Sequence, residues 1–448
     1  MKKLIVLILA LLCFLSVGVL ADGEEFDVDA KHAAVYNLEQ KKMLFEKEAN
    51  TIIYPASLVK IMTGILACDY YEARGGKDFT VTVSAEALLN VTGNKMGLQA
   101  GESVSFYDLI CALLVGSAND AAYVIAQTVG GSVENFVSMM NDRAAKLGAN
   151  NTCYANPSGY HSPYMYTTLF DQALICAHAA EKNLLLEISS LVSYEMSETD
   201  MSDKRRFVNQ NLLFDKTHWL RHYTPNTQGL NVGMTNEAGW CLATVYDNDG
   251  LTNIILISGG TVEKFDYHYL NDAKALIEYT SDSYDFITLL DSNKAMCDVE
   301  VELGRDKDRL LLATSRDITV LLPDSIDKDA DVKIEYNLSK ETFRAPIEEG
   351  EVFGEVRAFY KDELVGSVEL IATTDIEMSI PLYIIDKISS FFDIPLVKAI
   401  VRLILSLVFA FGCAAFIYVN VKRREHRQAR RRALAKNVSH ARKNINKY

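Results

Sequence analysis

The chain has 448 residues, of which 49% are hydrophobic, and a formal net charge of −14. This length supports a large core, two domains and accessory segments. The C-terminal tail contains eleven of the 45 Lys and Arg residues and only one of the 59 Asp and Glu residues. Two more lysines lie at the N-terminus. The body between them therefore has a charge of −26, which excludes a nucleic-acid-binding role. No Cys-x-x-Cys pair or His cluster indicates a metal, and we expect no cofactor.

A secretory signal peptide is expected over residues 1–21. Lys2 and Lys3 supply its positive end, the apolar run from Leu4 to Leu15 its centre, and small residues precede Asp22. An uncleaved anchor is the alternative, but the run is short for a membrane span. We therefore expect the body to be exported.

Residues 24–281 are expected to form a mixed α/β domain. Two strand-like runs within residues 32–50 flank a polar turn and predict a hairpin. Apolar residues at helical spacing predict helices near Ser57, after Ser105, and after Ser132, which is the expected N-cap of the last one. A second hairpin around an Asn-Asp-Gly turn and a closing helix complete this domain.

The first of these helices carries a pair of residues with possible chemistry. Ser57 and Lys60 are three residues apart, so their side chains lie on one side of the helix. A neutral lysine amine there can take the serine proton and make the hydroxyl a nucleophile. The backbone N–H of Ser57 can help to hold a developing oxyanion. This spacing is common by itself, and the interpretation depends on further residues.

A second polar pair, Ser117 and Asn119, follows within the next helical pattern. The hydroxyl can relay a proton between Lys60 and a leaving amine, and the amide can hold a substrate carbonyl. The alternative is a turn that breaks the helix and has no chemical role.

The third element is a strand-like segment, Thr227–Leu242, with glycines at positions 229 and 233. Gly233 allows the strand to approach a substrate backbone closely. Asn231 and Val232 precede this glycine, and Met234 follows it.

The C-terminal part has a different pattern. Short strands and turn residues over residues 282–380 predict a small β-sandwich. Residues 384–402 are amphipathic and are expected to lie along a membrane interface. Residues 403–421 contain no charge and are long enough to cross a bilayer as a helix. The basic residues of 422–448 predict a cytoplasmic tail, which places the body outside the cell and facing its wall.

The three chemical elements, in this order, resemble those of the penicillin-recognising serine enzymes. Further segments, including Asn156–Tyr160 and Asn209–Asn211, are similar to the D-alanyl-D-alanine carboxypeptidases, the low-molecular-mass penicillin-binding proteins. This resemblance covers most of residues 25–281. It implies an α+β fold of the β-lactamase/DD-peptidase type, followed by the small β domain and the membrane helix. It also implies peptidoglycan stem peptides as substrates and binding of β-lactams.

The resemblance also assigns roles to the residues. It implies that Ser57 attacks the carbonyl between two terminal D-alanines, with Lys60 as the base and Ser117 as the proton relay. The N–H groups of Ser57 and Met234 are expected to form the oxyanion hole, and Asn119 to bind the substrate.

This sequence departs from the family in the third element. It has Asn231-Val232-Gly233 where family members usually have Lys-Thr-Gly. The lysine and threonine of the family contact the terminal carboxylate of the substrate, and losing both contacts is expected to lower the rate by roughly 10²–10⁴. Tyr269 also occupies the place of a carboxylate-binding arginine. Three nearby residues are possible substitutes for the missing cations: Lys264, His268 and Arg221.

We therefore expect a serine-type D-Ala-D-Ala carboxypeptidase with weakened or altered carboxylate recognition. A peptidoglycan-binding protein that has lost catalysis is the alternative. A β-lactamase is disfavoured, because that class needs a deacylating glutamate and the chain has none between Glu134 and Glu181.

Overall fold

The computed structural model describes residues 26–445 except 90, 218–219 and 249. The expected signal peptide lies outside the described residues. The chain divides into two compact units. The N-terminal unit extends to residue 285 and includes residues 321–325, and the C-terminal unit contains the rest.

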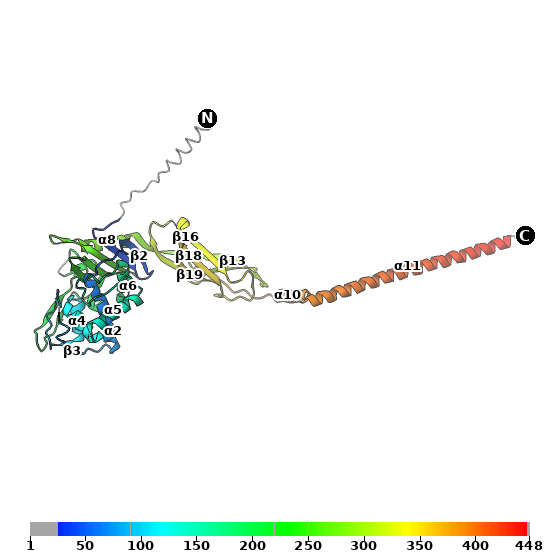
Figure 1. Ribbon diagram of the computed structural model, residues 1–448. Coiled ribbons are helices and arrows are strands. Elements are labelled where there is room, and N and C mark those ends of the chain that lie inside the picture. Colours follow the sequence, from blue (N-terminus) through cyan, green and yellow to red (C-terminus); the bar gives the residue numbers. More distant parts are fainter. Residues whose placement is uncertain (1–25, 90, 218–219, 249, 446–448) are drawn as a thin grey trace, which may run out of the picture. The chain divides into compact units, whose positions relative to one another are not determined.

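An antiparallel sheet of five strands, in the order β2-β1-β9-β8-β7, is the centre of the N-terminal unit (Figure 1). The pairs β1/β2 and β8/β9 confirm both expected strand hairpins. The third chemical element, expected as one strand, is divided between two: residues 227–235 form β7 at the edge of the sheet, and residues 239–242 begin β8. The strands are β1 (His32–Asn37), β2 (Lys42–Lys47), β7 (Thr227–Thr235), β8 (Gly239–Asn248) and β9 (Leu251–Gly260).

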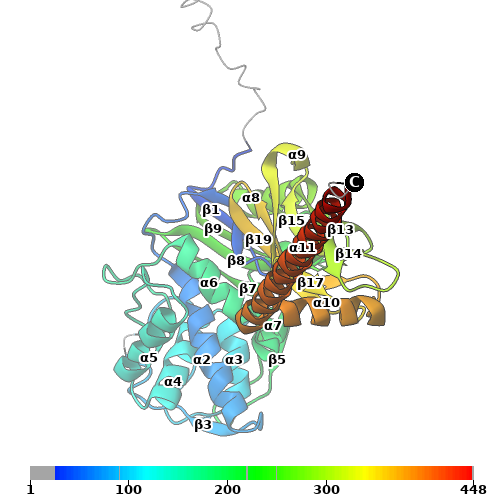
Figure 2. The same ribbon diagram turned by 90° about the vertical axis from the view of Figure 1, so that its right-hand side faces the viewer.

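The two faces of this sheet pack against different helices. Successive strand residues face opposite sides, and Ala34 of β1 belongs to the apolar cluster of α2 (Val59–Ala73) and α6 (Leu169–Ala180). Its neighbour Ala33 belongs instead to the cluster that includes α8 (His268–Ser283). Figure 2 shows α6 and α8 on opposite sides of the sheet. The long helix α8 confirms the expected closing helix.

Helix α2 is the axis of the helical region. Its residues from Val59 to Cys68 are all buried, as expected for a helix that is covered on every side. The Oγ of Ser132 accepts a hydrogen bond from the N–H of Asn135 at 3.1 Å, which confirms the expected cap of α5. The other helices here are α3 (Phe106–Leu114), α4 (Asn119–Gly130), α5 (Val133–Lys146) and α7 (Asn183–Ser189).

The helical pattern from Ser105 to Gly130 forms two helices, α3 and α4, with a break at residues 115–118. Ser117 in this break has a φ of +50°, which is incompatible with a continuous right-handed helix. The break places Ser117 two residues before α4 and Asn119 at the first residue of that helix.

Short elements connect these main ones. They are the strand pairs β3 (Thr80–Thr82) with β4 (Ser103–Ser105), β5 (Ser193–Met196) with β6 (Arg205–Val208), and β10 (Val262–Glu263) with β11 (Asp266–Tyr267), and the 3-10 turns η1 (Ala56–Leu58) and η2 (Leu212–Phe214).

The C-terminal unit is rich in β-structure, as expected. Its largest sheet has the order β16-β18-β19-β14-β13-β17, and β12 pairs with β15. Val356, Leu370 and Leu312 are completely buried in it. The elements are β12 (Tyr284–Leu290), β13 (Ala295–Glu302), β14 (Arg309–Thr314), β15 (Ile318–Pro323), α9 (Lys328–Asp331), β16 (Val332–Leu338), β17 (Phe343–Arg344), β18 (Val352–Tyr360) and β19 (Glu363–Ala372).

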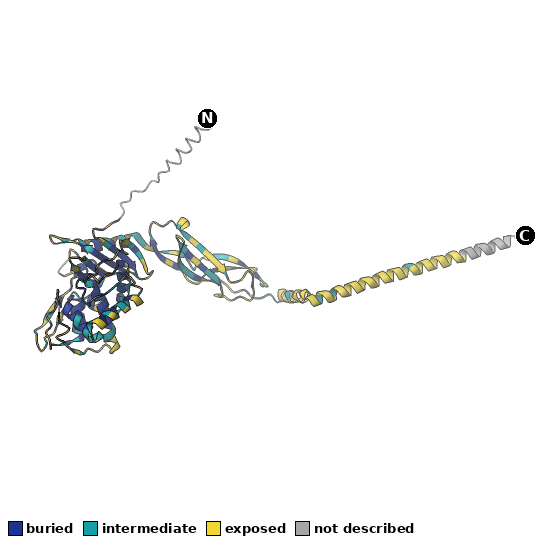
Figure 3. Ribbon diagram, in the orientation of Figure 1, coloured by how far each residue is buried: buried dark blue, intermediate teal, exposed yellow. Residues whose placement is uncertain are grey.

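Two apolar helices, α10 (Ile380–Asp393) and α11 (Pro395–Ile445), follow this β domain. Figure 3 shows that the described side chains of α11 are almost all exposed. Residues 395–433 of α11 contain a stretch with a mean hydropathy of 2.4, which is long and apolar enough to cross a membrane.

Candidate active site

Ser57 and Lys60 are in direct contact at the junction of η1 and α2. The Nζ of Lys60 donates to the Oγ of Ser57 at 3.1 Å and to the carbonyl oxygen of Ser158 at 2.6 Å. Lys60 is only 1% exposed, and this burial lowers its pKa to about 7. At neutral pH a substantial fraction of Lys60 is therefore an uncharged amine next to a hydroxyl.

Asn156 heads a short loop that fixes the buried lysine. Its Oδ1 accepts hydrogen bonds from the N–H groups of Ser158 at 3.1 Å and Gly159 at 2.9 Å. This arrangement holds the Ser158 carbonyl against Lys60. A Cβ on Gly159 would lie 1.9 Å from the carbonyl oxygen of Ala56. Ala56 has a φ of +48°, so the turn that presents the serine is strained, which is typical of functional sites.

A neighbouring segment holds Ser117 and Asn119 in place. The Nδ2 of Asn94 donates to the Ser117 carbonyl at 3.2 Å, and the Nδ2 of Asn119 donates to the Thr92 carbonyl at 2.6 Å. The N–H of Asn119 also donates to the Asn94 carbonyl at 2.8 Å. The carboxylate of Asp120 accepts hydrogen bonds from three backbone N–H groups of the same segment, those of Met96, Gly97 and Leu98.

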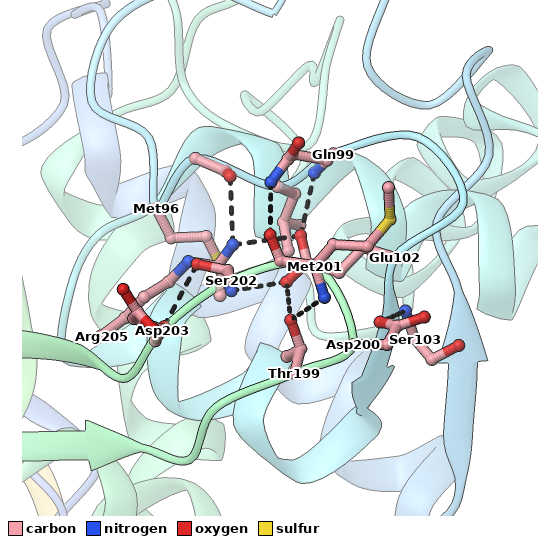
Figure 4. Close-up of polar contacts among 12 residues, drawn as sticks. Met96, Gln99, Glu102, Ser103, Thr199, Asp200, Met201, Ser202, Asp203 and Arg205 are labelled. Carbon is pink, nitrogen blue, oxygen red and sulfur yellow. Dashed lines mark hydrogen bonds and ion pairs between the residues drawn. The ribbon is translucent and has the colours of Figure 1, made fainter.

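A buried ion pair fixes the other end of this segment (Figure 4). Arg205 donates to both carboxylate oxygens of Glu102, at 2.7 and 3.0 Å, and to the carbonyl of Gly97 at 3.1 Å. Glu102 is completely buried and also accepts hydrogen bonds from the Thr199 hydroxyl and the Gln99 N–H. The pair therefore connects β6 to the loop that holds the second chemical element.

Strand β7 passes directly against Ser57. A Cβ on Gly233 would lie 2.3 Å from the Cβ of Ser57, 2.5 Å from its Oγ and 2.8 Å from its N. Only glycine allows this approach. Met234 follows Gly233 in the strand and also lines the cleft.

Asn231 and Val232 lie on opposite faces of β7. Asn231 shares its face with Gly233, on the Ser57 side of the sheet. It is 3% exposed, and its Nδ2 has no hydrogen-bond partner among the described residues. Val232 is 1% exposed and belongs to the apolar cluster with Tyr269 on the α8 side. It contributes packing there, and it has no hydroxyl to offer a ligand.

The predicted site residues gather around a cleft of about 470 Å³. Lys60 lies buried behind Ser57, and Asn231 and Val232 are buried in β7, so none of these three belongs to the lining. The predicted residues that line the cleft are Ser57, Ser117, Asn119, Gly233 and Met234.

Other lining residues were not predicted as site residues: Asn94, Tyr160, His161, Gln210, Glu237 and Trp240. Tyr160 and Gln210 lie in the two segments that carried the family resemblance, which could have indicated them. Asn94 and His161 had no comparable signal, because the contacts that bring them to the cleft are tertiary.

The cleft has an unusual balance of charge. Among the described residues, its lining contains no lysine or arginine. It does contain Glu237, whose Oε2 lies 3.8 Å from the Nδ1 of His161. An anionic ligand group would therefore find little compensation there.

The possible replacements for the missing cations lie elsewhere. Arg221 and His268 each lie against an aspartate, at 3.1 and 3.4 Å, and neither they nor Lys264 line the cleft. Tyr269, at the expected arginine place, stacks on Trp240 with ring centroids 4.9 Å apart and an interplanar angle of 3°.

Comparison with known proteins agrees with this geometry. A family model described as D-alanyl-D-alanine carboxypeptidase matches residues 19–259, more than half of the chain. The protein belongs to this carboxypeptidase family. A model described as the C-terminal domain of penicillin-binding protein 5 matches residues 284–378. Both the resemblance and the fold class expected from the sequence are thereby confirmed.

Individual members of the carboxypeptidase family are distant but similar over most of their length. D-alanyl-D-alanine carboxypeptidase DacF of Bacillus subtilis is 26% identical over 73% of this chain and 80% of its own. D-alanyl-D-alanine carboxypeptidase DacC of Escherichia coli is 27% identical, and the match also covers 73% of this chain and 80% of the length of DacC. The crystal structure of penicillin-binding protein 5 from Haemophilus influenzae, 25% identical, covers 79% of this chain and 99% of its own, with a TM-score of 0.57.

The buried ion pair gives a prediction about stability. Glu102→Gln would leave Arg205 buried without its counter-ion, so we expect it to lower the free energy of unfolding by roughly 3–5 kcal/mol. Urea unfolding followed by circular dichroism would measure this. Glu302→Gln, which breaks an exposed pair with Arg344, is the matched control and should have little effect. An equal effect of both changes would contradict the role of the buried pair.

The approach of Gly233 gives a prediction about reactivity. Gly233→Ala should displace β7 from Ser57 by the width of a methyl group and lower the acylation of Ser57 by roughly 100-fold or more. The variant should still fold, as judged by circular dichroism. Gly412→Ala, where an added methyl meets no atom within 4 Å, is the control. Normal acylation of the Gly233 variant would show that the strand does not shape the reaction centre.

Proposed function

We propose that this protein is a serine-type D-Ala-D-Ala carboxypeptidase that trims peptidoglycan stem peptides through an acyl-enzyme on Ser57. The observation that carries this proposal is the 3.1 Å contact between Ser57 and a buried lysine with a pKa of about 7. An uncharged amine within hydrogen-bond distance of a hydroxyl is the arrangement that nucleophilic catalysis requires.

In the proposed reaction, Lys60 takes the hydroxyl proton as the Oγ of Ser57 attacks the carbonyl between the two D-alanines. The N–H groups of Ser57 and Met234 hold the oxyanion. Ser117 then relays the proton to the leaving nitrogen, and the peptide bond breaks to release D-alanine. Water hydrolyses the remaining ester and frees the shortened peptide.

Two further elements hold the substrate in this proposal. Asn119, fixed by its bond to the Thr92 carbonyl, presents its side-chain oxygen to the substrate backbone. The exposed edge of β7 around Gly233 pairs with an extended peptide through main-chain groups. Neither contact depends on the side chains of Asn231 and Val232, which stand where the family usually has lysine and threonine.

A binding protein without catalysis is the second candidate. The absence of lysine and arginine from the described cleft lining favours it, since a carboxylate would bind weakly there. The contacts of Ser57, Lys60 and Ser158 favour an active enzyme. Burying a lysine costs free energy, and a catalytic role would explain why this one is buried.

We further propose that the protein is anchored in the cell membrane by α11, with the body outside the cell and the basic tail in the cytoplasm. The apolar stretch of α11 and the arginines that follow it support this orientation. Eight large apolar side chains of α10 are exposed, which suits a helix that lies in the membrane interface.

Labelling with a fluorescent penicillin tests the reaction and its base. The wild-type protein should form a covalent adduct, and the labelling rate should fall about tenfold for each pH unit below 7, because protonated Lys60 cannot accept the serine proton. Above pH 7 the rate should level off. Rates measured by gel fluorescence between pH 5 and 9 would show this profile.

Ser57→Ala is the control for this experiment and should give no adduct at any pH. Labelling of that variant would contradict the proposed nucleophile. If neither protein is labelled, Ser57-dependent hydrolysis of an ester substrate without a carboxylate decides the question. A labelling rate that does not change with pH would contradict Lys60 as the base, but it would not contradict the formation of an acyl-enzyme.

Protease treatment of intact protoplasts tests the topology. An external body should be degraded, whereas an antibody against the C-terminal tail should still detect a short protected fragment. The same treatment after detergent lysis is the control and should remove the fragment. Survival of the body in intact protoplasts would overturn the orientation.

A further inference from the structure

The end of the cleft that receives the leaving residue contains chemical groups unsuited to a free carboxylate. The proposed proton relay to the leaving nitrogen places this end beside Ser117 and the start of the Asn231–Gly233 stretch. A carboxylate that leaves water needs a cation or several hydrogen-bond donors. Among the described residues, the cleft lining offers uncharged hydroxyl and amide donors but neither lysine nor arginine, and it includes the carboxylate of Glu237, which repels an anion.

Lys60 does not fill this gap. Its Nζ is engaged by Ser57 at 3.1 Å and by the Ser158 carbonyl at 2.6 Å. A lysine that acts as the base must also be uncharged at the moment of attack, so it cannot neutralise an anion at the same time.

The side of β7 that faces α8 is apolar at this end. Val232 packs in the cluster that contains Leu213 and Tyr269. The ring of Tyr269 is stacked on Trp240, which itself lines the cleft. Of these residues only Trp240 lines the cleft, so this side of β7 gives an anion in the cleft no cationic partner.

The opposite side of β7 offers a neutral hydrogen-bond donor. Asn231 lies on the same face as Gly233, which is in contact range of Ser57. Its Nδ2 is buried and has no partner among the described residues. A buried donor of this kind is normally satisfied, but Asn231 lies beneath the lining of the cleft, where it brings an amide and no positive charge. Four uncharged carboxamides line the cleft itself, those of Asn94, Asn119, Gln210 and Asn236.

We propose that the substrate's leaving residue bears an uncharged carboxamide in place of a free carboxylate. This inference rests on the proposed function, and it changes the substrate class of the same site. Ser57 attacks the carbonyl of the preceding D-alanine, the bond to the leaving nitrogen breaks, and the proton goes to that nitrogen. The amino-acid amide departs, and water hydrolyses the acyl-enzyme as before.

A matched pair of peptides tests the proposal on the full-length protein in detergent. The probes are diacetyl-L-lysyl-D-alanyl-D-alanine and the same peptide with a C-terminal carboxamide. Mass spectrometry follows the release of D-alanine or D-alaninamide, which also shows that the bond between the two residues is the one cleaved. We expect kcat/KM for the amide to exceed that for the acid by at least about tenfold. Equal values, or a preference for the acid, would overturn the proposal.

A double substitution tests which residues set this preference. Asn231→Lys with Val232→Thr adds a cation and a hydroxyl, and should shift the ratio of acid to amide turnover by at least about tenfold towards the acid. Asn150→Lys adds the same charge at an exposed turn outside the cleft lining, and should leave the ratio unchanged. A shift of equal size in both variants would assign the effect to net charge and contradict the local mechanism.

A third probe separates failure of this proposal from failure of the proposed function. The p-nitrophenyl ester of diacetyl-L-lysyl-D-alanine has a leaving group that needs no recognition. If wild type but not Ser57→Ala hydrolyses the ester, the nucleophile is confirmed, and the peptide pair alone decides the proposal. Cleavage of neither peptide would then overturn only the amide preference. No Ser57-dependent turnover of the ester would overturn both.

Discussion

The burial of Lys60 beside Ser57 is the constraint on which the reaction centre depends. An amine that is 1% exposed is costly to charge, so its pKa falls to about 7 and its nitrogen needs a fixed acceptor. The Ser158 carbonyl is that acceptor, and the bonds of Asn156 hold it in place. Burial makes the folded protein less stable when Lys60 is charged. The same burial gives this proposed base a pKa suited to neutral pH.

Close backbone approaches assemble the site around this pair. Gly159 and Gly233 occupy positions where a methyl group would collide with η1. The positive φ angles of Ala56 and Ser117 show that the backbone is strained where two of the reactive groups are presented. Buried contacts, including the pair of Glu102 with Arg205, maintain this strain from outside the cleft.

The structure separates the reaction centre from the recognition of the substrate's end. In the proposed reaction, activation of Ser57 depends on η1, α2 and the loop after Asn156, which carry Ser57, Lys60 and Ser158. Recognition depends on β7 and the rings behind it, where Val232 and Tyr269 pack together. Gly233 of β7 lies against Ser57, but Val232 and Tyr269 pack on the other face of the strand, so the residues there can change while the nucleophile and its base remain intact.

The sequence by itself determined the local elements and the family. Periodicity and capping indicated both hairpins, the start of the helix at Ser57, the cap at Ser132 and the apolar C-terminal helix, since these depend on neighbours along the chain. Tertiary structure alone decided the break before α4, the face on which Val232 is buried, and the absence of lysine and arginine from the described lining of the cleft. The reason is physical: Lys60 and Ser158, or Ser57 and Gly233, meet only when distant segments pack, and no local spacing encodes such contacts.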